Sequence, residues 1–173
     1  MRDSTSTTKI QIRAASNTAA ASMLDTAYGS SRRFSDRVLV CGTRPEEWTV
    51  YGSSEEVLAF VANIPRDGFV TVIDITHGRA LLRITGSKAT SVLNKICNMD
   101  LSEELTPDGA VFSASVGNVS CDLTRNDQTA ETSFLISCER SFGKFLFIAV
   151  ADASTEFGLP IPHAWELHKN QKC

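Results

Sequence analysis

Hydrophobic and polar residues alternate along the central part of this chain in a pattern that occurs three times. Each occurrence is a short strand-like run, a break of a few residues, and a longer run whose apolar positions recur every three or four residues, as in an amphipathic helix. The strands are expected at 47–52, 80–85 and 133–138, and the helices at 53–65, 87–98 and 139–153. The repetition predicts a chain built from small strand–helix units.

The first and third of these helices carry the most specific signals. Ser53 and Glu56 have the spacing of a capping box, in which each side chain hydrogen-bonds a backbone N–H at the helix start. The predicted buried face of the third helix consists of Phe142, Phe145, Leu146, Ala149 and Val150. Because Phe147 and Ile148 are apolar as well, this helix should be buried on more than one side or contact a partner.

The remaining strand-like segments predict antiparallel pairing. Segment 68–76 is a continuous β-branched run, as expected of a strand covered on both faces. Segment 110–125 predicts a hairpin, since its Gly117-Asn118 turn supplies the positive φ that primed turns require. Segment 36–42 is expected to pair with the first strand of the repeat. Antiparallel neighbours with helices on one face predict an α+β fold rather than a doubly wound parallel sheet.

The pattern predicts one domain over residues 31–155, with two lobes at about 36–68 and 69–155. Residues 1–30 are rich in Ser, Thr and Ala and poor in large apolar side chains, which predicts a flexible N-terminal arm. A transit peptide has a similar composition, but Asp3 and the lack of an amphipathic arginine face disfavour that interpretation.

A second arm is expected at residues 156–173. Two prolines close together prevent a regular helix through the middle of this segment. Trp165 is its candidate anchor or interface residue.

Composition excludes several classes of protein. The net charge is −3 and the 17 Lys and Arg are scattered, which argues against a nucleic-acid partner. No apolar stretch approaches the roughly 20 residues needed to cross a bilayer, so no membrane partner is expected. The five cysteines lack C-x-x-C spacing and the three histidines lack a second ligand nearby, which disfavours a metal site and favours a reducing cytoplasm.

Motifs for phosphate binding or nucleophilic catalysis are missing, and the remaining candidates gather in the segment DITHGRALLRITG. In one interpretation, Asp74 orients His77 as a base while Arg79 and Arg83 clamp an anionic substrate. In the other, the residues THG form the corner of a hairpin with Gly78 supplying unusual dihedral angles. Arg79 or Arg83 then pairs with Asp74 or with a neighbouring chain. A lone histidine beside a glycine is a weak signal, so the spacing favours the structural interpretation.

The same segment resembles the central motif of the gamma subunit of heterotetrameric sarcosine oxidase. That family has a D-[VL]-[ST]-x-x-R strand, a G-x-x-A helix start and a K-x-C-x-x-D-L segment, matched here by Asp74, Thr76, Arg79, Gly86, Ala89, Lys95, Cys97, Asp100 and Leu101. Further matches are Gly42, Pro45, Glu47 and Trp48 upstream, and Arg140, Ser141, Phe142, Phe145 and Leu146 downstream. The resemblance extends over about residues 36–152. Ile96 and Ser87 depart from it, because family members often have Gly and Pro at these places.

The resemblance implies a fold related to the folate-binding aminomethyltransferase domains, made of repeated small antiparallel strand–helix subdomains. It also implies a non-catalytic subunit of an enzyme that oxidatively demethylates sarcosine to glycine, with hydrogen peroxide and formaldehyde or methylenetetrahydrofolate. FAD, FMN, NAD and tetrahydrofolate are implied for the whole complex and none for this chain alone. The implied partners are the alpha, beta and delta subunits. The chain is also similar to the gamma subunit of N-methylglutamate dehydrogenase, so the N-methyl amino acid stays open.

Within this family, the singled-out residues are expected to be structural or interface residues and not catalytic ones: Asp74, His77, Arg79, Arg83, Phe147 and Trp165. Two other hypotheses remain. One is a stand-alone tetrahydrofolate-binding one-carbon transfer protein, which needs a carboxylate to hold the pterin ring and a larger chain. The other is a binding or assembly module unrelated to amine oxidation.

Overall fold

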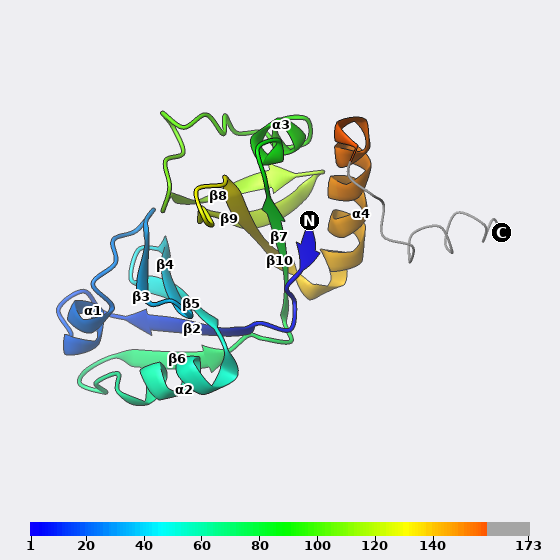
Figure 1. Cartoon of the computed structure of the whole chain (residues 1–173). Helices are drawn as coiled ribbons and strands as arrows, with labels where there is room; N and C mark the ends of the chain where they lie inside the picture. The colour runs from blue at the N-terminus through cyan, green and yellow to red at the C-terminus, as the bar shows by residue number, and fades with distance from the viewer. Residues whose placement is uncertain (159–173) are drawn as a thin grey trace.

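Two five-stranded antiparallel sheets lie face to face in the computed structural model, which describes residues 1–158 (Figure 1). The N-terminal sheet has the strand order β3-β4-β5-β2-β6 and the C-terminal sheet the order β1-β7-β10-β9-β8. The strands of the N-terminal sheet are β2 (Thr8–Ala14), β3 (Ser31–Ser35), β4 (Val38–Arg44), β5 (Glu47–Gly52) and β6 (Val70–Asp74). Those of the C-terminal sheet are β1 (Arg2–Asp3), β7 (Arg79–Thr85), β8 (Val111–Val116), β9 (Val119–Arg125) and β10 (Ser133–Glu139).

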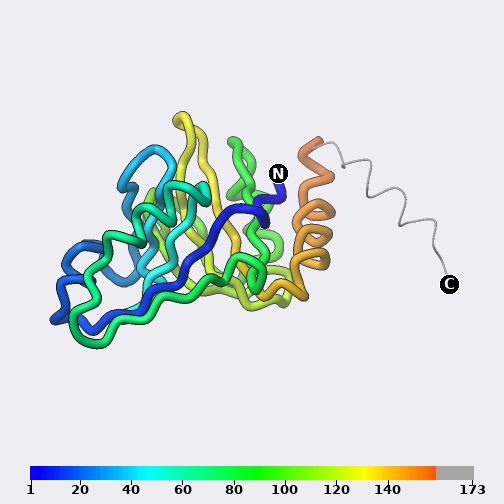
Figure 2. Tube along the Cα trace, turned by 90° about the horizontal axis from the view of Figure 1, so that it is seen from below, coloured from blue at the N-terminus to red at the C-terminus, as the bar shows by residue number. Residues whose placement is uncertain are grey.

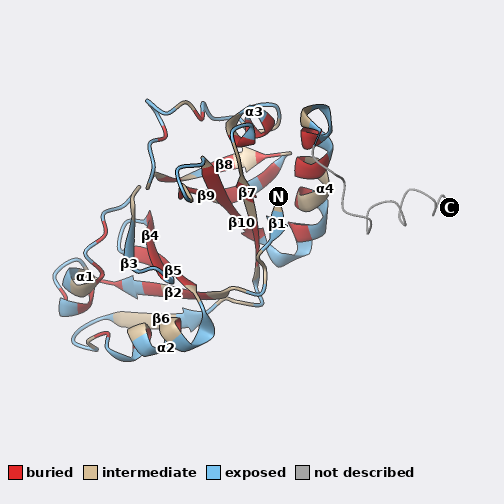
Figure 3. Ribbon diagram, viewed as in Figure 1, coloured by how far each residue is buried: buried red, intermediate tan, exposed pale blue. Residues whose placement is uncertain are grey.

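Helices cover the outer face of each sheet, so the fold has four layers. The helices are α1 (Ala19–Leu24), α2 (Ser54–Ala62), α3 (Ala89–Asn94) and α4 (Gly143–Ser154), with 3₁₀ turns η1 (Arg140–Phe142) and η2 (Thr155–Phe157) at the ends of α4. Helices α1 and α2 bury Leu24 and Val57 against the N-terminal sheet. Helices α3 and α4 bury Leu93 and Leu146 against the C-terminal sheet. Figure 3 shows the buried residues concentrated in the sheets and on the inward sides of the helices.

A third apolar cluster lies between the inner faces of the two sheets. Its members are Leu39, Cys41, Tyr51, Leu81, Val111 and Leu135. Successive side chains of a strand point to opposite faces of the sheet. Leu82 and Ile136 therefore enter the core beneath α3 and α4, whereas their neighbours Leu81 and Leu135 point toward the other sheet. The central strands β4, β5 and β10 are therefore buried on both faces.

Several predictions from the sequence are confirmed. The fold is α+β with antiparallel sheets, and β4 pairs with β5 as expected. Strands β8 and β9 form the predicted hairpin, with Gly117 and Asn118 at φ 55° and 65°. Half of the predicted capping box forms at α2: Ser53 Oγ accepts from Glu56 N at 3.4 Å, whereas Glu56 Oε2 accepts from Ser53 Oγ at 2.8 Å instead of from a backbone N–H.

The flexible arm predicted for residues 1–30 is wrong, because this segment supplies β1, β2 and α1. Strand β2 lies between β5 and β6, and Ile10 and Ile12 point into the core of the N-terminal sheet. The alternation of these isoleucines with polar residues is the strand signal that the Ser- and Thr-rich composition hides. Figure 2 shows β2 running beside β6 through this sheet.

The boundary between the two sheets lies at 75–78, and not at 68–69 as the predicted lobes require, since β6 belongs to the N-terminal sheet. The expected hairpin at His77 is wrong as well: β6 pairs with β2, whereas β7 pairs with β1 and β10. A turn connects the sheets, with Ile75 O accepting from Gly78 N and Arg79 N, each at 3.1 Å. Gly78 lacks the positive φ expected of it.

Strand β6 lies at the edge of its sheet and is not covered on both faces, in contrast to the prediction. The side chain of Ile73 is 49% exposed. A β-branched run indicates strand propensity but does not indicate whether the strand is central.

Helix α4 turns a different face to the core from the one predicted. Leu146 and Val150 are buried as expected, but Phe142 and Phe145 are about half exposed. The small residues Ala151 and Ala153 are buried instead, and Gly143 approaches β7 so closely that an added Cβ would lie 2.6 Å from Ala80 Cβ. Close packing of the helix start on the sheet therefore fixes the rotation of α4.

Candidate functional site between the two sheets

The candidate site is the seam between the inner faces of the two sheets, where charged and polar side chains from both sheets line two cavities. The apolar cluster around Tyr51 and Leu81 fills the middle of this seam. A cavity with polar lining lies at each end. We call these the Asp122 end and the Arg83 end, after the residue of the C-terminal sheet that each contains.

At the Asp122 end, a cavity of about 160 Å³ contains a network of charges. Arg79 Nη2 donates to Asp122 Oδ2 at 2.7 Å, and Arg79 Nη1 donates to Glu139 Oε1 at 3.2 Å. The other oxygen of Asp122 accepts from Ser113 Oγ at 2.8 Å and lies 3.5 Å from Arg44 Nη2. Both carboxylate oxygens of Asp122 are therefore engaged, and one of their partners reaches across from the N-terminal sheet.

The two ionisable groups in the middle of the seam are held in their neutral forms. Burial raises the pKa of the Tyr51 hydroxyl, and the nearby Cys41 and Asp122 raise it further. Burial also raises the pKa of the Cys41 thiol to about 12, although a hydrogen bond from Thr124 opposes this shift. Neither a phenolate nor a thiolate nucleophile is available here near neutral pH.

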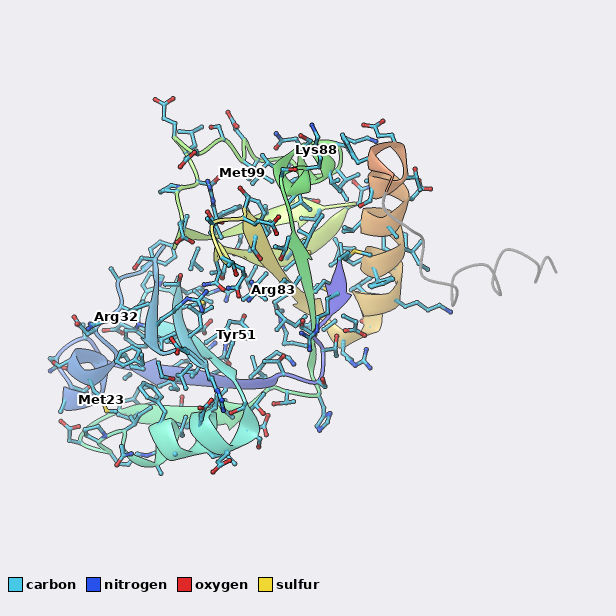
Figure 4. All side chains as sticks on the ribbon, in the orientation of Figure 1. Met23, Arg32, Tyr51, Arg83, Lys88 and Met99 are labelled. Carbon is cyan, nitrogen blue, oxygen red and sulfur yellow. The ribbon has the colours of Figure 1, made fainter. Side chains whose placement is uncertain are left out.

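At the Arg83 end, a cavity of about 170 Å³ is lined by both cationic and apolar groups. Figure 4 shows Arg83 and Tyr51 pointing into the space between the sheets. Arg83 donates to Ser133 Oγ at 2.8 Å and to Asn126 O and Oδ1 at 3.2 and 3.1 Å. Arg33, from β3 of the opposite sheet, donates to the same Asn126 Oδ1 at 2.9 Å.

The sequence-predicted residues Asp74 and His77 lie outside the seam. Both are exposed, and within residues 1–158 no hydrogen bond joins them. Asp74 Oδ1 instead accepts from Thr76 N at 2.8 Å, and hydrogen bonds from the Thr76 side chain and backbone lower the pKa of its carboxyl. The structure thus places Arg79 and Arg83 in the seam, but Asp74 and His77, the pair considered for acid–base catalysis, lie outside it.

The partners of the two arginines could not be identified from local spacing. Arg79 pairs with Asp122 and Glu139, not with Asp74. The alternation of side chains along the predicted hairpin could have indicated Asp122, because it places this residue on the face of the strand opposite the buried Cys121 and Leu123.

The structure describes the position of Phe147 but not that of Trp165, the other apolar residue proposed for an interface. Phe147 is partly buried against the core of the C-terminal sheet, and the exposed aromatic residues nearby are Phe142 of η1 and Phe145 of α4. Trp165 lies outside the residues that the structure describes.

Two further observations limit the chemistry of the described part of the chain. Residues 1–158 contain no group of three or more His, Cys, Asp or Glu side chains placed to hold a metal ion. None of the helices in this part is long and apolar enough to cross a membrane.

Comparison with known proteins identifies the class of protein. Residues 13–162 match the family model of the GCVT N-terminal domain, so the chain belongs to this family. An aminomethyltransferase of Geobacillus thermodenitrificans (strain NG80-2) is 32% identical over 93 residues, which are 54% of this chain and 25% of that protein. The matched part of the chain thus spans about a quarter of this curated relative.

A particular solved structure has the same fold. A chain of the heterotetrameric sarcosine oxidase from Corynebacterium sp. U-96, in complex with pyrrole 2-carboxylate, superposes with a TM-score of 0.78 at 22% identity. The match covers 92% of this chain and 85% of that one. The aminomethyltransferase-like fold expected from the sequence is confirmed.

Proposed function

We propose that this chain is a non-catalytic, gamma-type subunit of a heterotetrameric sarcosine oxidase-type complex in the cytoplasm. Such a complex oxidatively demethylates sarcosine to glycine, with hydrogen peroxide and formaldehyde or methylenetetrahydrofolate as further products. The observation that carries the proposal is the match to a sarcosine oxidase chain over 85% of that chain's length, compared with a quarter of the aminomethyltransferase.

The seam supports a non-catalytic role because the carboxylates at its Asp122 end are already paired with cations. Asp122 is held by Arg79 and Ser113 and faces Arg44, and Glu139 is held by Arg79. A general base needs a free lone pair within hydrogen-bond reach of its substrate. Arg79 and Asp122 would therefore act as a structural pair that links β7 to β9 across the intervening strand β10.

The residues of the seam also do not fit a folate. A carboxylate that binds the pterin ring must be free to accept its N–H groups, whereas Asp122 is engaged. The cavity of about 160 Å³ is smaller than the roughly 300 Å³ at which small-molecule pockets begin. We therefore assign tetrahydrofolate, FAD, FMN and NAD to the alpha and beta subunits, and a metal site to the delta subunit.

The exposed side of α4 is our candidate contact with a partner subunit. Phe142 and Phe145 lie one turn apart and are 51% and 53% exposed. Aromatic residues are enriched in the cores of protein interfaces. In this proposal, Phe147 supports the contact from below through its packing on the core.

Isolation of the native complex tests the proposal. The tagged full chain is expected to co-purify with a flavin-containing chain, and the isolated complex should consume oxygen when sarcosine is added. Phe142→Ser with Phe145→Ser should prevent co-purification, whereas Leu58→Ser, at an exposed leucine on α2, should not. A flavin-containing oxidase that assembles fully and is active without this chain would contradict the proposal.

Two related functions are separated by simple measurements. The 32% identity to an aminomethyltransferase favours a stand-alone tetrahydrofolate-binding protein as the second candidate. Calorimetric titration of the full chain with tetrahydrofolate should then give saturable heat, which our first proposal does not expect. Comparison of sarcosine with N-methylglutamate as substrates of the isolated complex distinguishes an oxidase from an N-methylglutamate dehydrogenase.

A further inference from the structure

The Arg83 end of the seam holds two guanidinium groups together without a carboxylate. Asn126 Oδ1 accepts from Arg33 Nη2, Arg83 Nη2 and Gln128 Nε2, at 2.9, 3.1 and 2.9 Å. Within residues 1–158 neither arginine forms an ion pair. The nearby Asp127 is occupied by Arg125, at 3.0 Å. A neutral amide oxygen thus stands where two positive charges would ordinarily share a carboxylate.

Further positive charge surrounds this pair. Arg2 of β1 lies directly opposite Arg83 of β7 in the antiparallel register, whereas Arg37, which also lines the cavity, is paired with Glu56 at 3.7 Å. The carboxylate that lines it is Asp36, which is exposed and forms no ion pair among residues 1–158. Burial lowers the pKa of Arg83, and the positive charges of Arg33 and Arg2 lower it further. This end of the seam therefore carries uncompensated positive charge.

The two arginines also have donors left over. A guanidinium group has five N–H donors in a planar fork that suits a carboxylate or phosphate. Arg83 donates three hydrogen bonds to Asn126 and Ser133, all from its Nη atoms. Arg33 donates only from Nη2. Among residues 1–158, the Nε and remaining Nη donors of both residues have no hydrogen-bond partner and could bind a ligand.

The other lining of the cavity is apolar, which selects among anions. Val38, Leu39, Leu81 and Leu135 line it together with Tyr51. A volume of about 170 Å³ corresponds to about five or six water molecules at roughly 30 Å³ each. An anion with a short hydrocarbon part would contact both the arginines and the apolar side chains of the cavity, whereas inorganic phosphate would contact the arginines alone.

We propose that the Arg83 end of the seam is a binding site for a small organic carboxylate, held by the guanidinium groups of Arg33 and Arg83. The hydrocarbon part of the ligand lies against the leucines of the seam. Asn126 is a positioning residue, since it holds both guanidinium groups at the required separation. The site is independent of the subunit role proposed above and lies at the opposite end of the seam from Asp122.

Titration of the purified full chain tests this site, with butyrate as the probe and its uncharged isostere butyramide as the control. Butyrate should bind saturably by calorimetry and raise the melting temperature at constant ionic strength, and butyramide should do neither. Arg33→Gln, on an exposed strand, should raise the dissociation constant about tenfold, as expected when a charge-assisted hydrogen bond is lost. Arg66→Gln removes one exposed arginine outside the cavity lining and should leave binding unchanged.

A second variant distinguishes loss of the binding site from loss of protein stability. Asn126→Asp places a carboxylate of the same shape between the two arginines, so it should raise the melting temperature and abolish the effect of butyrate. The proposal is overturned if butyrate acts no more strongly than chloride or phosphate at equal ionic strength. An equal loss of binding in Arg66→Gln, or unchanged binding in Asn126→Asp, also overturns it.

Discussion

Arg79 and Arg83 occupy the same face of β7, yet the fold treats their charges in opposite ways. They are four residues apart, which corresponds to about 13 Å along a strand. Arg79 meets two carboxylates, whereas Arg83 meets a neutral amide and hydroxyl and lies near other arginines. One side chain is therefore a structural cation and the other is available for an anion.

We expect Arg79→Ala to lower the free energy of unfolding by about 2 kcal/mol, because it leaves the largely buried Asp122 without its closest cation. Urea unfolding followed by circular dichroism measures this change. His77→Ala is the control, since His77 is exposed, and it should change stability by less than about 0.5 kcal/mol. In an assembled oxidase, a large loss of turnover in His77→Ala would restore the catalytic interpretation of Asp74 and His77.

Arg2→Gln should stabilise the protein by about 0.5 kcal/mol, because like charges directly opposite each other on paired strands repel. The gain should shrink as salt screens the repulsion. Thermal unfolding at low and high ionic strength measures both effects. Equal gains at the two ionic strengths would show that repulsion from Arg83 is not the cause.

At the scale of elements, sequence patterns correctly predicted those helices and turns whose stability depends on residues close together in the sequence. The Ser53 cap of α2 and the Gly117-Asn118 turn depend on neighbouring residues, and both form as expected. The position of β2 inside a sheet depends on pairing with β5 and β6, which its composition does not indicate. The rotation of α4 depends on the close approach of Gly143 to Ala80, which periodicity alone does not indicate.

Gly42→Ala should lower the free energy of unfolding by more than about 2 kcal/mol, since backbone must move to accept a new side chain. A Cβ at Gly42 would lie 2.2 Å from the carbonyl oxygen of Ala27, where the segment before β3 crosses β4. Gly78→Ala is the matched control: its nearest neighbour would be 3.7 Å away and its φ is not positive. Chemical denaturation of both variants checks the comparison. Similar losses at the two positions would contradict this explanation.

At the scale of the whole molecule, the sequence indicated two residues of the seam but not the seam itself. Arg79 and Arg83 could be singled out because they interrupt an apolar strand. Their partners come from β9, β10 and the loop after β9, which are distant along the chain. Which strands meet across two packed sheets is decided by tertiary contacts, so local spacing could not predict the site.

Acid should destabilise the molecule through carboxylates that are ionised in the folded state. Burial raises the pKa of Glu47, but hydrogen bonds from Arg44 and Arg13 outweigh it and hold the pKa below its usual range. A group with a lowered folded-state pKa contributes its full stability above the unfolded value, about 4.3 for glutamate, and loses it as the pH falls further. We expect unfolding free energies measured between pH 6 and pH 3 to decline below about pH 4.3, and Glu47→Gln to make the decline shallower. An unchanged slope in Glu47→Gln would assign acid sensitivity to other groups.

The order of strands along the chain has a consequence for folding. All five strands of the N-terminal sheet lie between Thr8 and Asp74, so they are synthesised before β7 begins. Strand β1 is made first but pairs with β7, and must therefore wait for its partner until the whole other sheet has been made. Once the N-terminal sheet has formed, the pairing of Ile10 with Asp74 leaves only short segments between the ends of that sheet and β1 and β7, so the small number of paired residues in β1 limits its stability. We therefore expect the short β1 strand to be the last part of the sheets to dock and the first to open in native-state hydrogen exchange.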